Sequence, residues 1–229
     1  MLRNVEYDGK ADRRNFLKLV SVASAATGIL SFANTASVAE THATAAAPRT
    51  QKTWQTAATL RDLWIHHIFW IRNVCLATFN KNDPAMKAAE QQVVANSQSI
   101  AATMEPFYGA AAKESFFKLL AGHYGAVRTY LVATADNDAS AQGTATQSIT
   151  SNAEEIADFL SKANPYLPKD AVYGFLLAHG GHHIEQIQEL HGRKYDSEAK
   201  TWADMKDHIY EIADATADAL AKQFPKIFS

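Results

Sequence analysis

The sequence predicts an all-α protein: an up-and-down antiparallel bundle of about six helices that follows a signal peptide. Long stretches of the chain carry apolar residues at the three-and-four spacing of a helix, and patterns typical of strands are nearly absent. The 229 residues include only 10 Gly and 6 Pro. Such low counts disfavour a β-sandwich or barrel, which needs many turns, and favour long uninterrupted elements.

The first segment of the chain resembles a twin-arginine export signal. Residues 12–18 read D-R-R-N-F-L-K and match the motif S/T-R-R-x-F-L-K at Arg13 and Arg14, with Asp12 in place of Ser or Thr. The apolar stretch at 19–32 is shorter than the roughly 20 residues of a membrane span, and it is typical of the apolar core of a signal peptide. A small-x-small cleavage site follows at 37–39, with a second option at 43–45.

The resemblance implies a signal peptide at 1–39, a linker at 40–51 and a helical-bundle domain at 52–229. It implies export by the twin-arginine translocation machinery, a periplasmic or extracellular location, and no stable membrane anchor after cleavage. The alternative is an anchor that the mature protein keeps. Because the pathway carries folded proteins, many of which acquire a cofactor first, the resemblance also favours a bound metal or cofactor.

Composition excludes several other classes of site. The formal net charge is −2, so the chain lacks the basic surface expected of a nucleic-acid-binding protein. Cys75 is the single cysteine, which excludes an intrachain disulfide and any metal site built from several cysteines. No C-x-x-C-H, G-x-S-x-G or phosphate-loop motif occurs.

Six amphipathic segments follow the linker, separated by Asn, Asp, Gly and Pro residues that end or begin helices. The short connections between them predict antiparallel neighbours. No repeat of fixed period is visible. The helices are expected at about Thr53–Phe79, Pro84–Met104, Ala111–Thr134, Ser140–Lys162, Lys169–His191 and Ser197–Gln223.

Four of the nine histidines fall at the centres of apolar helix faces: His67, His123, His179 and His183. A buried imidazole without a hydrogen-bond partner is destabilising by roughly 1–3 kcal/mol. One divalent metal ion could serve all four, and a His-x3-His pair on one helix places two ligands within reach of the same ion. The alternative is four separate core histidines, each with its own partner.

Five further residues are weaker candidates. They are candidates for additional ligands or for hydrogen-bonding partners of the imidazole rings. Three of them flank apolar helix faces, Asp214 lies further round its helix, and Tyr108 carries no strong signal. These residues are His208, Asn96, Asn152, Asp214 and Tyr108.

The histidine pattern resembles that of the hemerythrin and DinB-like metal-binding bundles. His67 and the His179/His183 pair match the first-helix histidine and the His-x3-His pair of hemerythrin. His208 and Asp214 are six positions apart where that pattern has five, and no His-x3-Glu pair occurs. These two departures from the hemerythrin pattern favour a site with one metal ion over a di-iron site.

The chain from Leu63 to Phe228 also resembles a group of uncharacterised bacterial helical proteins. The similar stretches include Leu63-Trp64 with His67, Pro106–Gly109 and Gln223–Pro225. Three functions follow as hypotheses: an exported bundle that binds one zinc or non-haem iron ion, a non-catalytic binding or structural bundle, and a haem-b electron-transfer bundle.

Overall fold

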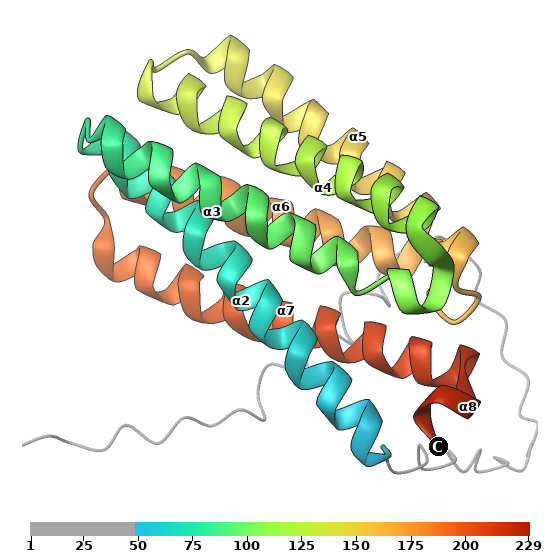
Figure 1. Cartoon of the computed structure of the whole chain (residues 1–229). Coiled ribbons are helices and arrows are strands. Elements are labelled where there is room, and N and C mark those ends of the chain that lie inside the picture. Colours follow the sequence, from blue (N-terminus) through green and yellow to red (C-terminus); the bar gives the residue numbers. More distant parts are fainter. Residues whose placement is uncertain (1–48) are drawn as a thin grey trace, which may run out of the picture. The chain divides into compact units, whose positions relative to one another are not determined.

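A computed structural model describes residues 49–229, and this part of the chain is helical throughout, with no strand. Successive long helices run in opposite directions (Figure 1), which confirms the predicted up-and-down bundle. The helices are α2 (Gln51–Phe79), α3 (Asp83–Ala102), α4 (Glu105–Ala135), α5 (Ala139–Ala163), α6 (Lys169–His191), α7 (Tyr195–Gln223) and α8 (Pro225–Phe228). The proposed export motif with Arg13 and Arg14, and nearly all of the linker, lie outside the described residues.

The helix starts follow from capping side chains. Thr50, Asn82 and Asp138 each accept a hydrogen bond from a first-turn backbone N–H, at α2, α3 and α5 respectively. Such caps typically stabilise a helix by about 1 kcal/mol. The six predicted helices therefore begin and end close to their expected bounds, with two departures at the same end of the bundle.

The first departure is in α4, which begins at Glu105 instead of near Ala111. Its opening turn is separated from the rest by Gly109, which has φ 82° and ψ 174°. A residue with a Cβ rarely adopts this φ, which explains the glycine at this position. The interruption expected here is therefore a kink at one residue and not a loop. The second departure is α8, which the sequence did not predict. Its Phe228 is buried and stacks on Phe107, with ring centroids 5.9 Å apart.

The six long helices form three hairpins that repeat every 56 residues. The hairpins are α2–α3, α4–α5 and α6–α7, and their turns place Lys81, Asn137 and Arg193 in the left-handed conformation, with φ of 54°, 57° and 55°. In each turn the next backbone N–H bonds to the carbonyl five residues earlier, at 2.9, 2.8 and 2.8 Å. This is the Schellman arrangement that ends many helices. The expectation that no fixed-period repeat exists was wrong.

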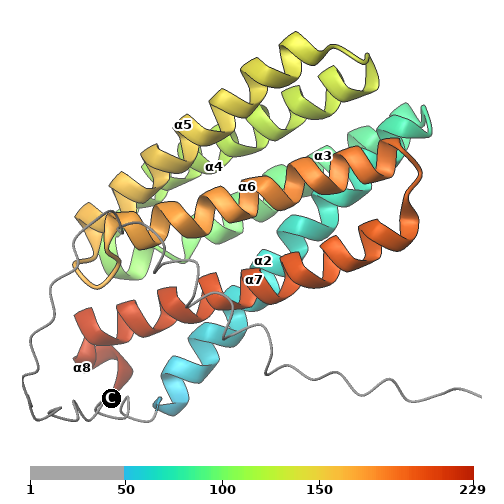
Figure 2. The same ribbon diagram turned by 180° about the vertical axis from the view of Figure 1, so that it is seen from behind.

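The hairpins are arranged around a common axis. The first helices of the hairpins, α2, α4 and α6, run in the same direction and contact one another at the centre, as Figures 1 and 2 show from opposite sides. Each second helix packs against two of them: α3 against α2 and α4, α5 against α4 and α6, and α7 against α6 and α2. The described chain therefore has approximate threefold symmetry, with the inner helices closest to the axis.

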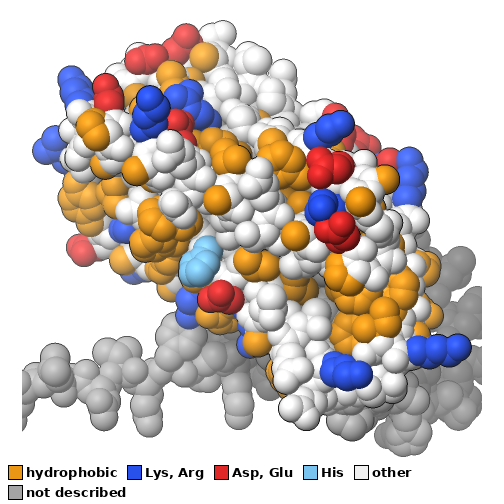
Figure 3. Space-filling view, viewed as in Figure 1, with side chains coloured by type: hydrophobic (Ala, Val, Ile, Leu, Met, Phe, Trp, Pro, Cys, Tyr) orange, Lys and Arg blue, Asp and Glu red, His pale blue; other side chains and the backbone are white. Residues whose placement is uncertain are grey.

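The core has two main apolar clusters along this axis. One contains Leu60, Phe116 and Met205, and the other contains Val74, Val127 and Leu190. On each inner helix, the first central histidine falls between residues of the two clusters. The surface, in contrast, mixes charged and apolar side chains on the face shown in Figure 3. Within residues 49–229, every helix is too short or too polar to cross a membrane.

Candidate metal centre

Four histidines meet on the axis of the bundle. His67 comes from α2, His123 from α4, and His179 and His183 from α6. All four side chains are buried, and each offers a ring nitrogen within 4.8 Å of those of the other three. The structure therefore brings together the four residues that the sequence placed at the centres of apolar faces, close enough to hold a metal ion.

The threefold repeat explains this convergence. His67, His123 and His179 occupy the same position in successive 56-residue repeats, and their ring centroids lie 5.8, 5.9 and 5.5 Å apart. His183 breaks the symmetry, because the equivalent residues are Ile71 and Val127. It lies one turn after His179, with the two Nε2 atoms 3.1 Å apart. Two nitrogens at this separation, each about 2.0–2.1 Å from one ion, would subtend about 100° at the metal.

The rings have almost no other partner. Both nitrogens of His67, Nε2 of His123, and Nδ1 of His179 and of His183 are buried without a hydrogen bond among the described residues. Each buried polar atom left without a partner is destabilising by about 1–3 kcal/mol. The arrangement does not fit four separate core histidines that are each satisfied by a neighbour. One nitrogen of each ring, however, lies close enough to those of the other three to share an ion.

Burial keeps the rings neutral, which is the protonation state that binds metal. Burial, with repulsion from His123, lowers the pKa of His67 to about 3. Burial lowers the pKa of His123 to about 4, although the Asn152 side chain partly offsets it. The pKa values of His179 and His183 are also lowered well below their usual range by burial and by the neighbouring imidazoles.

The outer helices support the cluster at equivalent positions. Asn96 on α3 and Asn152 on α5 donate from Nδ2 to the carbonyls of Leu63 and Leu119, at 2.9 and 3.0 Å. Each of these carbonyls lies one turn before a clustered histidine. In the third hairpin His208 takes this position, with Nε2 2.8 Å from the carbonyl oxygen of Phe175. His208 thus packs beside the cluster without belonging to it.

Two other candidates lie elsewhere. Asp214 on α7 accepts hydrogen bonds from Arg61 on α2 and from Arg49, which lies just before α2. The Tyr108 hydroxyl donates to Gln223 at 2.6 Å and accepts from Asn164 at 3.1 Å, at the end of the bundle near α8. Neither residue belongs to the histidine cluster.

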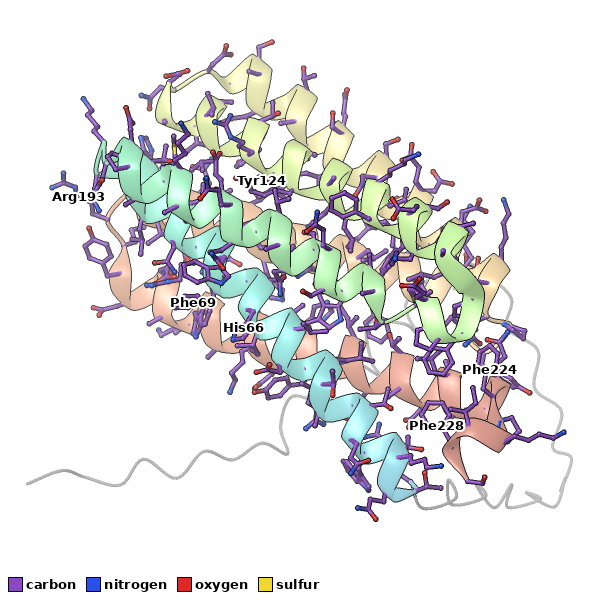
Figure 4. The ribbon with its side chains drawn as sticks, viewed as in Figure 1. His66, Phe69, Tyr124, Arg193, Phe224 and Phe228 are labelled. Atoms are coloured by element: carbon purple, nitrogen blue, oxygen red, sulfur yellow. The ribbon has the colours of Figure 1, made fainter. Side chains whose placement is uncertain are left out.

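The neighbouring histidines point away from the cluster. His66 is exposed on the outside of α2, where Figure 4 labels it near Phe69. His182 is half-buried and faces the His208 ring at a centroid distance of 5.5 Å. These two residues are matched controls for His67 and His183, because each is a histidine one position away on the same helix.

Sequence reasoning missed an ion pair between α2 and α7, in which Glu198 is buried and the Arg72 side chain is 33% exposed. Arg72 donates from Nε and Nη2 to the two carboxylate oxygens of Glu198, at 2.6 and 2.8 Å, and Gln186 donates to Glu198 at 2.9 Å. Burial alone would raise the pKa of Glu198, but the bonds from Arg72 and Gln186 outweigh it and lower the pKa. Arg72 and Glu198 are 126 positions apart, and no local pattern indicates that they pair.

No protein-family model, curated protein or solved structure matches this chain. The resemblances to twin-arginine signals and to hemerythrin-like bundles therefore stay predictions. What the structure itself shows is an all-α bundle whose four buried histidines lie within reach of one metal ion.

The low histidine pKa values predict acid sensitivity of the metal-free protein. The unfolded chain takes up protons near the ordinary pKa of 6.5, whereas His67 and His123 in the folded protein do so only near pH 3 and 4. Above pH 6.5 these rings are neutral in both the folded and the unfolded chain. As the pH falls from 6.5 toward 4, protons bind preferentially to the unfolded chain, so the free energy of unfolding decreases. Each histidine contributes up to about 1.4 kcal/mol per pH unit there.

Urea unfolding of metal-free protein between pH 7.5 and 5 measures this loss. In this range Asp and Glu, with ordinary values of 3.8 and 4.5, contribute little. The variant His66→Ala should show the same pH dependence as the wild type, because His66 is exposed. A flat profile from pH 6.5 to 5 would contradict the prediction.

Proposed function

We propose that this protein is an exported helical bundle that binds one transition-metal ion through His67, His123, His179 and His183. One observation carries the proposal: four buried imidazoles from three helices converge, and each offers one ring nitrogen within 4.8 Å of those of the other three. A single cation would satisfy one lone pair of each ring, because neutral imidazole is among the most common metal ligands in proteins.

The ligand set favours zinc or non-haem iron. Imidazole nitrogens suit both ions, and no carboxylate or thiolate belongs to the cluster in the described chain. A di-iron centre of the hemerythrin kind is disfavoured, since the cluster offers no bridging carboxylate. Haem b is disfavoured too, because four converging imidazoles occupy the space that the porphyrin nitrogens would need.

A bound ion would also stabilise the fold. Ligands from three hairpins would be tied at one point, and any ion that binds only the folded state raises its stability by mass action. Export in a folded state is consistent with loading of the metal before translocation. Cell fractionation tests the export, and wild-type protein confined to the cytoplasm would contradict it. In a variant with both Arg13→Lys and Arg14→Lys, unchanged location outside the cytoplasm would contradict the twin-arginine route.

Elemental analysis of untagged protein tests the central proposal. We expect about one equivalent of zinc or iron per chain, removal by a chelator, and a lower melting temperature after removal. Restoring the metal should restore the melting temperature. Purified protein that stays free of metal, and that neither binds nor is stabilised by added zinc or ferrous iron, would favour the non-catalytic structural bundle instead.

A further inference from the structure

An apolar cavity of about 60 Å³ reaches the histidine cluster from one side. Its wall includes two of the clustered rings, His123 and His179, and is otherwise almost wholly apolar or small. A cavity needs roughly 10–15 Å³ to hold one water-sized sphere, so this one has room for a small molecule. Four of its apolar residues are Trp64, Leu120, Leu176 and Val172.

The register of the inner helices places this cavity opposite His183. Trp64, Leu120 and Leu176 each precede by three positions the histidine that its own repeat contributes to the cluster. His183, in contrast, follows His179 by four positions. Because the three inner helices run in the same direction, the cavity lies on one side of the three symmetry-related rings, and His183 approaches from the other.

A surface groove adjoins the cavity. Leu60 and Thr103 line the cavity and also line this wider groove of about 310 Å³ beside α8. Phe228 forms part of the far wall of this groove. Figure 4 shows Phe228 and Phe224 at this end of the bundle.

We propose that an ion held by the four histidines keeps an open coordination position on the cavity side, opposite His183, and that this position binds a small uncharged ligand. The inference rests on the proposed function. Three imidazoles surround the axis and the fourth approaches from one side. The coordination position on the opposite side of the ion therefore faces the cavity. Metal sites that bind external ligands keep such an open position.

The wall chemistry selects the ligand class. An anion that entered would lose its hydration and find almost no hydrogen-bond donor along the cavity, which is unfavourable by several kcal/mol. A small uncharged molecule with a lone pair does not meet this obstacle, and it could bind to the ion reversibly.

Nitric oxide binding to the anaerobic ferrous-loaded protein tests the proposal. Electron paramagnetic resonance should show one nitrosyl per bound iron in the wild type, and azide should bind at least tenfold more weakly. The variant Val172→Phe fills the cavity with a side chain that the equivalent residue Phe116 already has. It should weaken nitric oxide binding at least tenfold and leave the iron content unchanged.

Leu176→Trp, which introduces the side chain of the equivalent residue Trp64, is a second cavity-filling variant, and Val94→Phe on the exposed face of α3 is the control. Bound iron without a nitrosyl signal would overturn the open position and leave the metal site intact. Equal binding of azide would overturn the ligand class. Unchanged nitric oxide affinity in both folded cavity variants would overturn the cavity as the place where the ligand binds. Failure to bind iron or zinc at all would overturn the proposed function and this inference with it.

Discussion

Replacing His183 with alanine is expected to reduce bound metal from about one equivalent per chain to near zero. The ion would lose one of four nitrogen ligands, and the Nε2 of His179 would lose its neighbour 3.1 Å away. Metal content by elemental analysis and the melting temperature with and without added metal measure the effect. The increase in melting temperature that metal gives the wild type should be absent from the variant.

A matched control separates ligand loss from a packing defect. His182→Ala changes the adjacent histidine, which lies outside the cluster, and should keep both the metal and the metal-dependent increase in melting temperature. Comparing the metal-free forms isolates the cavity left by the missing ring, which is destabilising by itself. If His183→Ala retains a full equivalent of metal, His183 is not a ligand.

Replacing Arg72 with methionine is expected to destabilise the metal-free protein by about 1.5–3 kcal/mol. The side chain of Glu198 is only 3% exposed, and without Arg72 its charge keeps only the bond from Gln186. Loss of hydrogen bonds to a charged group has an effect of this size. Breaking a fully buried pair would have a larger effect, but the Arg72 side chain is 33% exposed. Urea unfolding at pH 7.5 measures the difference.

Two comparison variants sharpen this prediction. Lys162→Ala removes an exposed pair with Asp158 and should change stability by less than about 0.5 kcal/mol. The double variant Arg72→Met/Glu198→Leu should lose less stability than Arg72→Met alone, because no unpaired charge remains buried. A single-variant effect as small as that of Lys162→Ala would show that water or another group compensates Glu198.

The helices were predictable because each one carries its own periodicity and its own end signals. Asn82 and Asp138 mark helix starts by their residue type alone. The first turn of α4 and the whole of α8 were not predicted. Each is about one turn long, too short to show a helical period, and α8 depends on packing between Phe228 and Phe107, which lie far apart in sequence.

The sequence indicated which histidines face the interior but not their level along the axis. A helical wheel gives the direction of each side chain around its helix but not its position along the bundle axis. It therefore cannot separate Asp214 and His208 from Asn96 by their distance to the site. The 56-residue period supplies the missing position, since it aligns Asn96, Asn152 and His208 at one level. The repeat is also present in the amino-acid letters, since His67, His123 and His179 recur at this interval, as do Ile100, Ile156 and Ile212. Comparing the chain with itself at a shift of 56 residues would have shown it.

The placement of one histidine per hairpin at His67 and His123 has a consequence for ancestry. A lone hairpin of this type holds a single imidazole and cannot surround an ion, whereas three identical copies related by rotation could. The chain has the form that triplication of a self-associating ancestral gene would leave, with the fourth imidazole, His183, gained in one copy only.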